Sequence, residues 1–244
     1  MSKKLIGLLL AVALVVGLLP MISLAEEAKT TKVGILSRID MEVTEGGAAA
    51  YLKNSEYQGY NEDGEATSKG YTQVAGTAED WNIKFEYPAG GTPTLTFKDA
   101  KLDHIHDDGT ALWKADSAAE TGYSKVATLS AILPKTTTAH DLKIVLQGEN
   151  LIEVDYGFIR GDYTDNGFAG INNLTIVGEA NSNLNLKAGT YGGTRVKKDM
   201  NVTLENVTAT MSAGRQYAPL SVSGKGILTV KNSNLNLVGN ESAC

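Results

Sequence analysis

The sequence predicts an all-β protein built as a parallel β-helix, in which each turn of the chain stacks on the turn before it. From about residue 94 onward, short segments alternate apolar and polar residues, which is the period of a β-strand. β-Branched residues fill these segments, and glycine and asparagine separate them. This region contains no apolar stripe at helical spacing, which argues against helical and leucine-rich repeats.

A repeated phrase supports the stacking. An apolar residue, Thr or Lys, and a second apolar residue are followed closely by Gly, Asn or Asp, and the copies begin 47, 32, 28 and 26 residues apart. The first residues of the copies are Leu95, Leu142, Leu174, Val202 and Leu228. The five-residue motif Ser-Asn-Leu-Asn-Leu also occurs twice, at 182–186 and 233–237. The two copies are 51 residues apart, which is about two periods. Periods of this size indicate stacked supersecondary units.

The apolar residues of the phrase are expected to point inward and to stack into files. One predicted file contains Leu95, Leu142, Leu174, Val202 and Leu228, and the other contains Phe97, Ile144, Ile176, Leu204 and Val230. Asn150, Asn206 and Asn232 are predicted at turns, where their side chains can form ladders that satisfy backbone groups. A β-sandwich with short strands is the alternative fold, but word-for-word repetition is typical of stacked repeats.

A resemblance to a known family rests on three of these segments. The phrases KIVLQGENLIEV, NNLTIVGEANSNLNL and ILTVKNSNLNL resemble the right-handed, pectin-lyase-like β-helix repeats of secreted and surface proteins of gut Firmicutes. Those proteins are often labelled as carbohydrate-binding-domain proteins. The resemblance covers about residues 81–238 and implies a right-handed β-helix. Because the chain stops just after a predicted strand, without a polar capping turn, we expect residues 81–244 to be a β-solenoid that is truncated at its C-terminus.

The first 25 residues have the pattern of a secretory signal peptide. Two lysines at positions 3 and 4 precede an apolar run over 5–19, and small residues at 23 and 25 define a cleavage site after Ala25. The alternative is an uncleaved anchor, since the run is just short of a membrane span. We therefore predict a secreted or cell-surface protein. Its single cysteine, Cys244, excludes an internal disulfide.

Residues 26–80 are predicted to be an irregular N-terminal segment. We expect a strand at 33–36, a short helix at 44–53 with Thr44 as its N-cap, and a polar loop over 51–76. Alternation from Trp81 to Tyr87 then predicts a strand that pairs with the first repeat like a hairpin. This pair would cap the N-terminal end of the β-helix and cover its open edge.

Charge and composition narrow the function. A formal net charge of -6 gives no basic surplus for binding nucleic acid. The densest set of metal-ligand types is His104, His106 and Asp107, but two aspartates before Gly109 are equally typical of a turn, so no metal is predicted.

The leading functional prediction is a non-catalytic protein that binds extracellular glycans or other cell-surface polymers and needs no cofactor. Four aromatic residues could stack on the apolar faces of sugar rings: Tyr163, Phe168, Tyr191 and Tyr217. The alternative is a polysaccharide lyase or glycosidase on the same scaffold. Enzymes of the family it resembles use clustered carboxylates, an Arg or Lys base and in some cases Ca²⁺, which would assign catalysis here to Arg160, Asp162 and Asp165.

Overall fold

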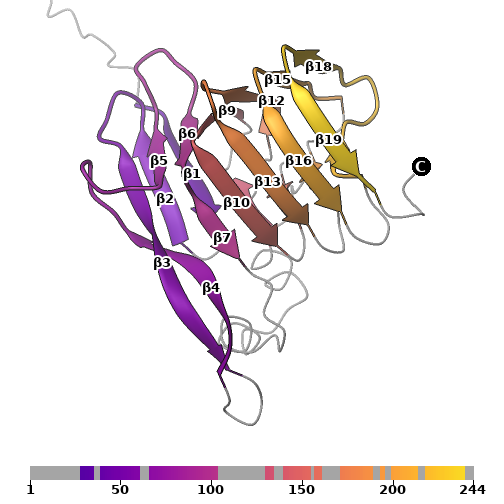
Figure 1. Cartoon of the computed structure of the whole chain (residues 1–244). Coiled ribbons are helices and arrows are strands. Elements are labelled where there is room, and N and C mark those ends of the chain that lie inside the picture. The colour runs from indigo at the N-terminus through magenta and orange to yellow at the C-terminus, as the bar shows by residue number, and fades with distance from the viewer. Residues whose placement is uncertain are drawn as a thin grey trace, which may run out of the picture.

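The structure is a computed structural model, and every regular element in its described part is a β-strand, as predicted. The described residues are 28–35, 39–60, 66–103, 130–134, 140–154, 157–160, 171–188, 193–195, 199–213 and 218–239. The strands form three sheets (Figure 1). Within these ranges, no helix has the length and hydropathy needed to cross a membrane. The predicted signal peptide and Cys244 lie outside the described residues.

The three sheets are called A, B and C below. Sheet A has the order β17 (Leu220–Ser221), β14 (Thr194–Arg195), β11 (Gly157–Arg160), β8 (Ser130–Pro134), β1 (Thr30–Ile35) and β2 (Ile39–Thr44). Sheet B has the order β18 (Leu228–Lys231), β15 (Val202–Glu205), β12 (Ile171–Gly178), β9 (His140–Gln147), β6 (Thr94–Lys98), β5 (Ile83–Glu86), β3 (Ala50–Tyr60) and β4 (Ala66–Ala75). Sheet C has the order β19 (Asn234–Val238), β16 (Thr208–Ala213), β13 (Asn183–Ala188), β10 (Glu149–Val154) and β7 (Lys101–Asp103).

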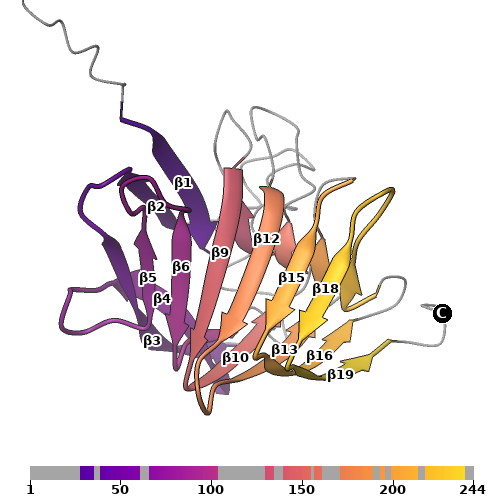
Figure 2. The same cartoon turned by 90° about the horizontal axis from the view of Figure 1, so that it is seen from above.

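From β6 onward the chain visits sheet B, then C, then A, and repeats this order (Figure 2). We call one such pass a rung; β12, β13 and β14 form one example. Each strand of a rung pairs in parallel with the equivalent strand of the next rung, in sheet A, sheet B and sheet C alike. The prediction of parallel sheets is therefore confirmed.

The register of sheet B confirms most of the predicted apolar files. Leu174 pairs with Leu142 and Val202, and Val202 pairs with Leu228. The first step of each file is wrong by two residues, because Leu95 pairs with Ile144 and not with Leu142. The reason is the position of the turn: the backbone N–H of Asp99, just after β6, bonds to the carbonyl oxygen of Gln147 at the end of β9. The turns therefore determine the register. From Leu142 to its turn β9 runs two residues further than β6 does from Leu95 to its turn.

The repeated Ser-Asn-Leu-Asn-Leu words lie two rungs apart in sheet C. Leu184 in β13 pairs with Ala209 in β16, which pairs with Leu235 in β19. The 51-residue offset therefore corresponds to two rungs, as the sequence predicted.

The apolar side chains of the three sheets meet in one core. Its middle contains residues such as Phe97, Phe158 and Ile176, and the Phe97 and Phe158 rings pack with their centroids 6.0 Å apart. Of the ten residues in the two predicted files, eight are buried, namely Leu95, Phe97, Leu142, Ile144, Leu174, Ile176, Val202 and Leu204. Leu228 and Val230 are 44% and 46% exposed, so their predicted burial is wrong. Their strand, β18, is the terminal strand of sheet B, so in the described part of the chain no further rung stacks beyond it and these side chains have neighbours on one side only.

The N-terminal segment is largely β-structure and not irregular. The predicted helix at 44–53 is wrong, because Thr44 ends β2, Gly46 turns the chain with a φ of 70°, and β3 begins at Ala50. The predicted loop over 51–76 is also wrong, since β3 and β4 form an antiparallel hairpin. The strand near residue 33 is confirmed as β1, and the predicted antiparallel pairing of the Ile83 segment with the first repeat is confirmed as β5 with β6.

The corner between sheets B and C repeats a backbone conformation. Asp99, Gly148, Asn206 and Asn232 each follow a sheet B strand and have φ values of 49°, 63°, 56° and 46°. Among residues with side chains, asparagine and aspartate tolerate this left-handed region best. Asn206 and Asn232 therefore lie at turns as predicted. The predicted side-chain ladder is wrong, because in the described part no hydrogen bond joins the side chains of Asn150, Asn206 and Asn232. Asn150 lies within β10, and its side-chain oxygen instead accepts a hydrogen bond from the backbone N–H of Ala100.

Candidate functional site

The structure does not test the site residues predicted from sequence. The metal candidates His104, His106 and Asp107, the catalytic candidates Asp162 and Asp165, and the aromatic candidates Tyr163, Phe168, Tyr191 and Tyr217 lie outside the described residues. Arg160 is the last residue of β11, and only its backbone is described. All of them stay predictions.

The outer face of sheet C is a regular polar surface in the described part of the chain. On β13 the residues Leu184, Leu186 and Ala188 are buried, while the alternate residues point outward. β16 repeats this pattern with Ala209, Met211 and Ala213 inward. Because successive side chains of a strand point to opposite faces, the residues between them form an outer surface.

Six uncharged residues form the centre of this surface. They make two rows, Asn183, Thr208 and Asn234 in the first and Asn185, Thr210 and Asn236 in the second, and we call them the Asn/Thr array. All six are exposed. Neighbours within a row are about 4.8 Å apart, and the two rows are about 6.7 Å apart, as the strand spacing and rise require. The array is therefore a flat lattice of hydroxyl and amide groups.

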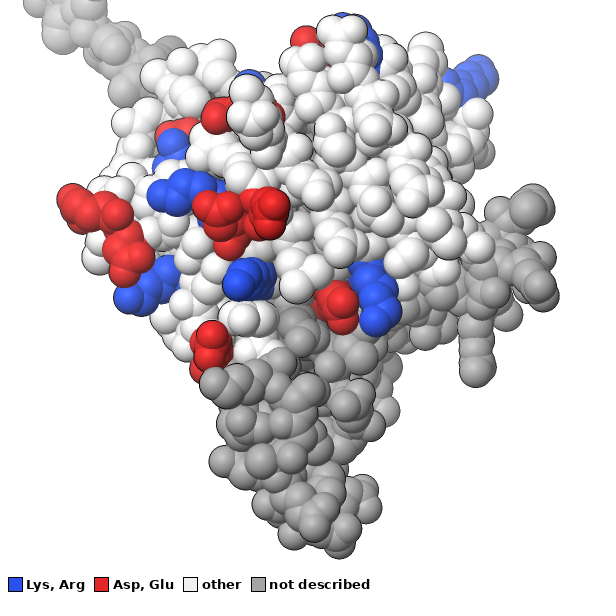
Figure 3. Space-filling model, viewed as in Figure 1, with Lys and Arg blue, Asp and Glu red and all other residues white. Residues whose placement is uncertain are grey.

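Charges border the array and do not interrupt it. Figure 3, which views this face, shows a wide uncharged area over β13, β16 and β19, with most of the acidic and basic groups on the side of the N-terminal strands. On β10 the two rows continue as Glu149 and Leu151, so the array ends there. Along its far border, Lys187 forms an ion pair with Glu153 at 3.6 Å. The centre of the face offers hydrogen bonds without net charge.

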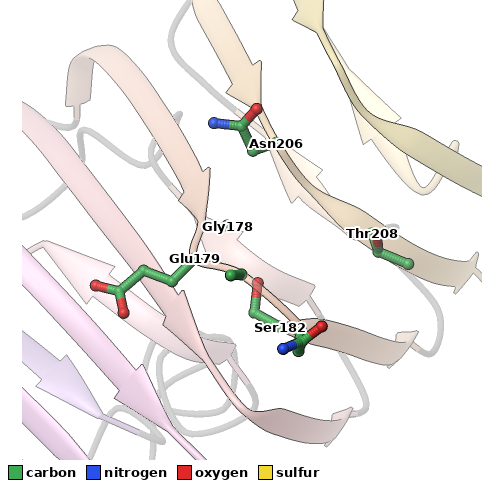
Figure 4. A pocket seen from close by; sticks show the side chains of 7 residues that line it. Gly178, Glu179, Ser182, Asn206 and Thr208 are labelled. Carbon is green, nitrogen blue, oxygen red and sulfur yellow. The ribbon is translucent and has the colours of Figure 1, made fainter.

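A notch lies beside the array at the corner between sheets B and C. The connection from β12 to β13 spans four residues, 179–182, whereas β15 to β16 and β18 to β19 each need two. The longer connection leaves a cavity of about 510 Å³ lined by Gly178, Glu179, Ala180, Asn181, Ser182, Asn206 and Thr208 (Figure 4). Thr208 also belongs to the array, so the notch and the array share a border.

The notch is built from a turn and a close backbone approach. The Ser182 N–H bonds to the carbonyl oxygen of Glu179 at 3.0 Å, which closes the turn. The carbonyl oxygen of Asn206 packs against Gly178 so closely that a β-carbon there would overlap it. The Glu179 carboxylate accepts a hydrogen bond from Gln147 Nε2 at 2.9 Å, and this bond orients it. The hydroxyl oxygen of Ser182 is buried without a hydrogen-bond partner.

The chemistry available here is hydrogen bonding. Glu179 is the one carboxylate that lines the notch, whereas glycoside hydrolysis ordinarily uses a pair of them. No set of three or more His, Cys, Asp or Glu side chains within the described ranges could hold a metal ion. Hydroxyl and amide groups such as Thr208, Asn206 and Asn181 can both donate to and accept from a polyol.

Sequence reasoning missed the Asn/Thr array, although part of its signal was present. The repeated Asn-Leu-Asn motif indicates a repeat, but the motif alone does not show that its asparagines lie side by side on one surface. The Thr-Ala-Thr segment between the two copies becomes part of the lattice only through the register of β16. No protein-family model, curated protein or solved structure matches the chain.

Proposed function

We propose that the chain is a right-handed parallel β-helix, exported from the cell, whose Asn/Thr array binds neutral extracellular polysaccharide without cleaving it. The observation that carries this proposal is the double row of six exposed, uncharged hydrogen-bonding side chains. The regular visits of the chain to sheets B, C and A support the β-helix. The signal-peptide pattern of residues 1–25 supports export.

A lattice of this kind suits an extended sugar chain. Each sugar presents several hydroxyl groups, which both donate and accept hydrogen bonds, as Asn and Thr side chains do. The spacing of about 4.8 Å along each row is of the same order as the length of one sugar ring, so successive sugars can meet successive strands. Each contact contributes only about 1 kcal/mol, and a single short site therefore binds near the millimolar range. A long polymer binds more tightly because it meets several contacts at once.

The charge around the array favours a neutral ligand. The protein has a formal net charge of -6, and Glu149 and Glu179 lie at the borders of the array and notch, whereas Glu153 is paired with Lys187. An acidic polymer would be repelled at low ionic strength, whereas binding of a neutral one would change little with salt. Salt dependence therefore separates the proposed hydrogen-bonding contact from a nonspecific ionic one.

The test is sedimentation of the purified chain with insoluble cellulose, mannan, xylan and chitin, with polygalacturonate gel as the acidic comparison. We expect retention on at least one neutral polymer. The double variant T208V/T210V removes two array hydroxyls while keeping side-chain shape, and should weaken binding about thirty-fold, since two contacts of about 1 kcal/mol are lost. The matched control T203V/T229V removes two hydroxyls from the outer face of sheet B and should bind as the wild type does.

Three results would contradict the proposal. Retention on none of the neutral polymers, or equal loss in both double variants, would remove the array as a binding surface. New reducing ends or unsaturated products, measured with and without Ca²⁺, would instead support the enzyme alternative. In that case Arg160, Asp162 and Asp165 become the residues to substitute.

A further inference from the structure

The notch at the corner between sheets B and C lies beside the Asn/Thr array, and not at one end of its rows. Each row runs across β13, β16 and β19, because it joins paired residues of neighbouring strands. Asn183 and Thr208 are the first residues of β13 and β16, so they belong to the row nearest this corner. The notch is lined by residues directly before these two strands and by Thr208 itself. It therefore lies sideways from the direction in which a polymer would follow the rows.

A serine that closes the corner of a later rung does not close this one. Ser182 and Ser233 occupy the same position in the two copies of the Ser-Asn-Leu-Asn-Leu motif. The Ser233 hydroxyl accepts a hydrogen bond from the Val207 N–H at 3.0 Å and donates to the carbonyl oxygen of Lys231 at 2.7 Å. The Ser182 hydroxyl forms neither kind of bond within the described residues. Its connection has two more residues than that of Ser233, and the corner is left hollow.

The part of the notch that faces the array is uncharged. The hydrogen bond from Gln147 Nε2 holds the Glu179 carboxylate on the side of β9, away from Asn206 and Thr208 (Figure 4). The side chains of Asn206 and Thr208 are exposed, and they form no side-chain hydrogen bond within the described ranges. Their amide and hydroxyl groups are therefore available to a ligand, and both groups can donate and accept.

We propose that the notch binds a one-sugar branch of the polysaccharide whose main chain lies along the array. A cavity of about 510 Å³ has the size of a small-molecule site, which suits a short branch and not a continuing chain. A branch leaves its main chain sideways, and the notch lies sideways from the row that contains Thr208. This inference rests on the proposed binding of neutral polysaccharide to the array, and it adds that branched polymers bind more tightly than linear ones.

The test compares linear oligosaccharides of mannose, xylose and glucose with the same main chains that carry a single one-sugar branch. The branches are galactose on mannose, arabinose on xylose and xylose on glucose. Dissociation constants for the purified full chain are measured by titration followed by NMR. For at least one main chain we expect the branched form to bind about five-fold more tightly or better, which is the gain from one added hydrogen bond. The linear forms contact the array alone, so their dissociation constants report whether the array is intact.

Two variants change the notch itself. Asn206→Gly removes the amide and keeps a residue that tolerates the φ of 56°, and it should weaken binding of the branched form about five-fold. Ala180→Leu narrows the notch and should abolish the preference for the branched form. The matched control is Asn232→Gly, which removes the same side chain from a left-handed corner that does not line the notch. This control should keep the full preference.

The branch site and the array fail in different ways. If no oligosaccharide and none of the insoluble neutral polymers binds, the array proposal fails and the branch site fails with it. If neutral polymers bind but no branched form binds more tightly than its linear form, the array stands and the branch site is overturned. A preference that survives both Ala180→Leu and Asn206→Gly, or one that is lost equally in Asn232→Gly, would also overturn the assignment of the branch to the notch.

Discussion

The side-chain oxygen of Asn150 accepts a hydrogen bond from the backbone N–H of Ala100 at 3.0 Å, and Asn150 is 2% exposed. Its Nδ2 donates to the carbonyl oxygen of Gln147 at 3.1 Å. The two residues belong to successive rungs, so one buried amide joins the corner of one rung to the backbone of the rung before it. Buried polar groups of this kind stabilise a fold only while both partners are present.

We predict that Asn150→Leu lowers the free energy of unfolding by about 1–3 kcal/mol, because the buried Ala100 N–H loses its acceptor. Urea denaturation measures this change. The matched control is Asn185→Leu, on the exposed face of β13, which should change stability by less than about 0.5 kcal/mol. If both substitutions lowered the free energy of unfolding equally, the hydrogen bond between Asn150 and Ala100 would not be what stabilises this corner.

Leu204→Asp should unfold or loosen the last rungs. Leu204 is 2% exposed, and an unpaired buried carboxylate costs several kcal/mol, which is a large part of the stability of a domain. Val230, its partner in the next rung, is 46% exposed, so Val230→Asp should shift the melting midpoint much less. Thermal melts of the two variants side by side measure the difference, and equal midpoints would contradict the assignment of Leu204 to the core.

The parallel sheets could be predicted because their signal is local and repeated. From Leu142 onward each rung has the same alternation of apolar and polar residues, so aligning the first apolar residues of the copies predicts the correct pairing of their strands. At Leu95 the predicted pairing is wrong, because the position of the turn, and not the start of the strand, determines which residues pair. The β3–β4 hairpin was missed because its strands are mostly polar and are stabilised by pairing with each other, which no single segment reveals.

The candidate surface was harder to predict than the fold. Asn234 and Asn236 are conspicuous in the sequence, but Thr208 and Thr210 join them only through the register of three strands. The exposure of Leu228 and Val230 could not be predicted from the repeat, since their sequence is that of a buried strand. Within the described residues β18 is paired on one edge only, and the periodicity of a segment does not show how many of its edges are paired.

The backbone at Asn206 predicts a contrast between two substitutions. Asn206 has a φ of 56°, a region that costs most residues with a β-carbon about 1–2 kcal/mol and costs glycine nothing. Asn206→Gly should therefore retain stability, and Asn206→Ala should lose about 1 kcal/mol. Urea denaturation of the pair measures this. If the two variants were equally stable, the left-handed conformation would not be what selects asparagine at this corner.

Removal of divalent metal should leave the fold unchanged. The described residues contain no set of three or more metal-ligating side chains, and backbone pairing between rungs supplies the order that a structural metal supplies elsewhere. Melting curves with and without a chelator should superimpose. A large drop in the midpoint on chelation would contradict this and direct attention to His104, His106 and Asp107 or to the carboxylates near Asp162.

The last prediction concerns the loss of stability at acidic pH. His140 begins β9, and its pKa is lowered mainly by burial, with a smaller contribution from Lys29; the neighbouring Asp141 acts in the opposite direction. The folded protein therefore binds a proton at His140 less readily than the unfolded chain does, so protonation favours unfolding. The contribution of His140 to the free energy of unfolding should be fully present above the ordinary histidine pKa of 6.5 and should be lost as the pH drops below it.

The substitution His140→Gln removes this contribution, and comparison with the wild type separates it from the effects of the other two histidines. Melting midpoints between pH 7.5 and pH 5.5 should decrease less in His140→Gln than in the wild type. Parallel pH profiles would show that His140 is equally easy to protonate in both states.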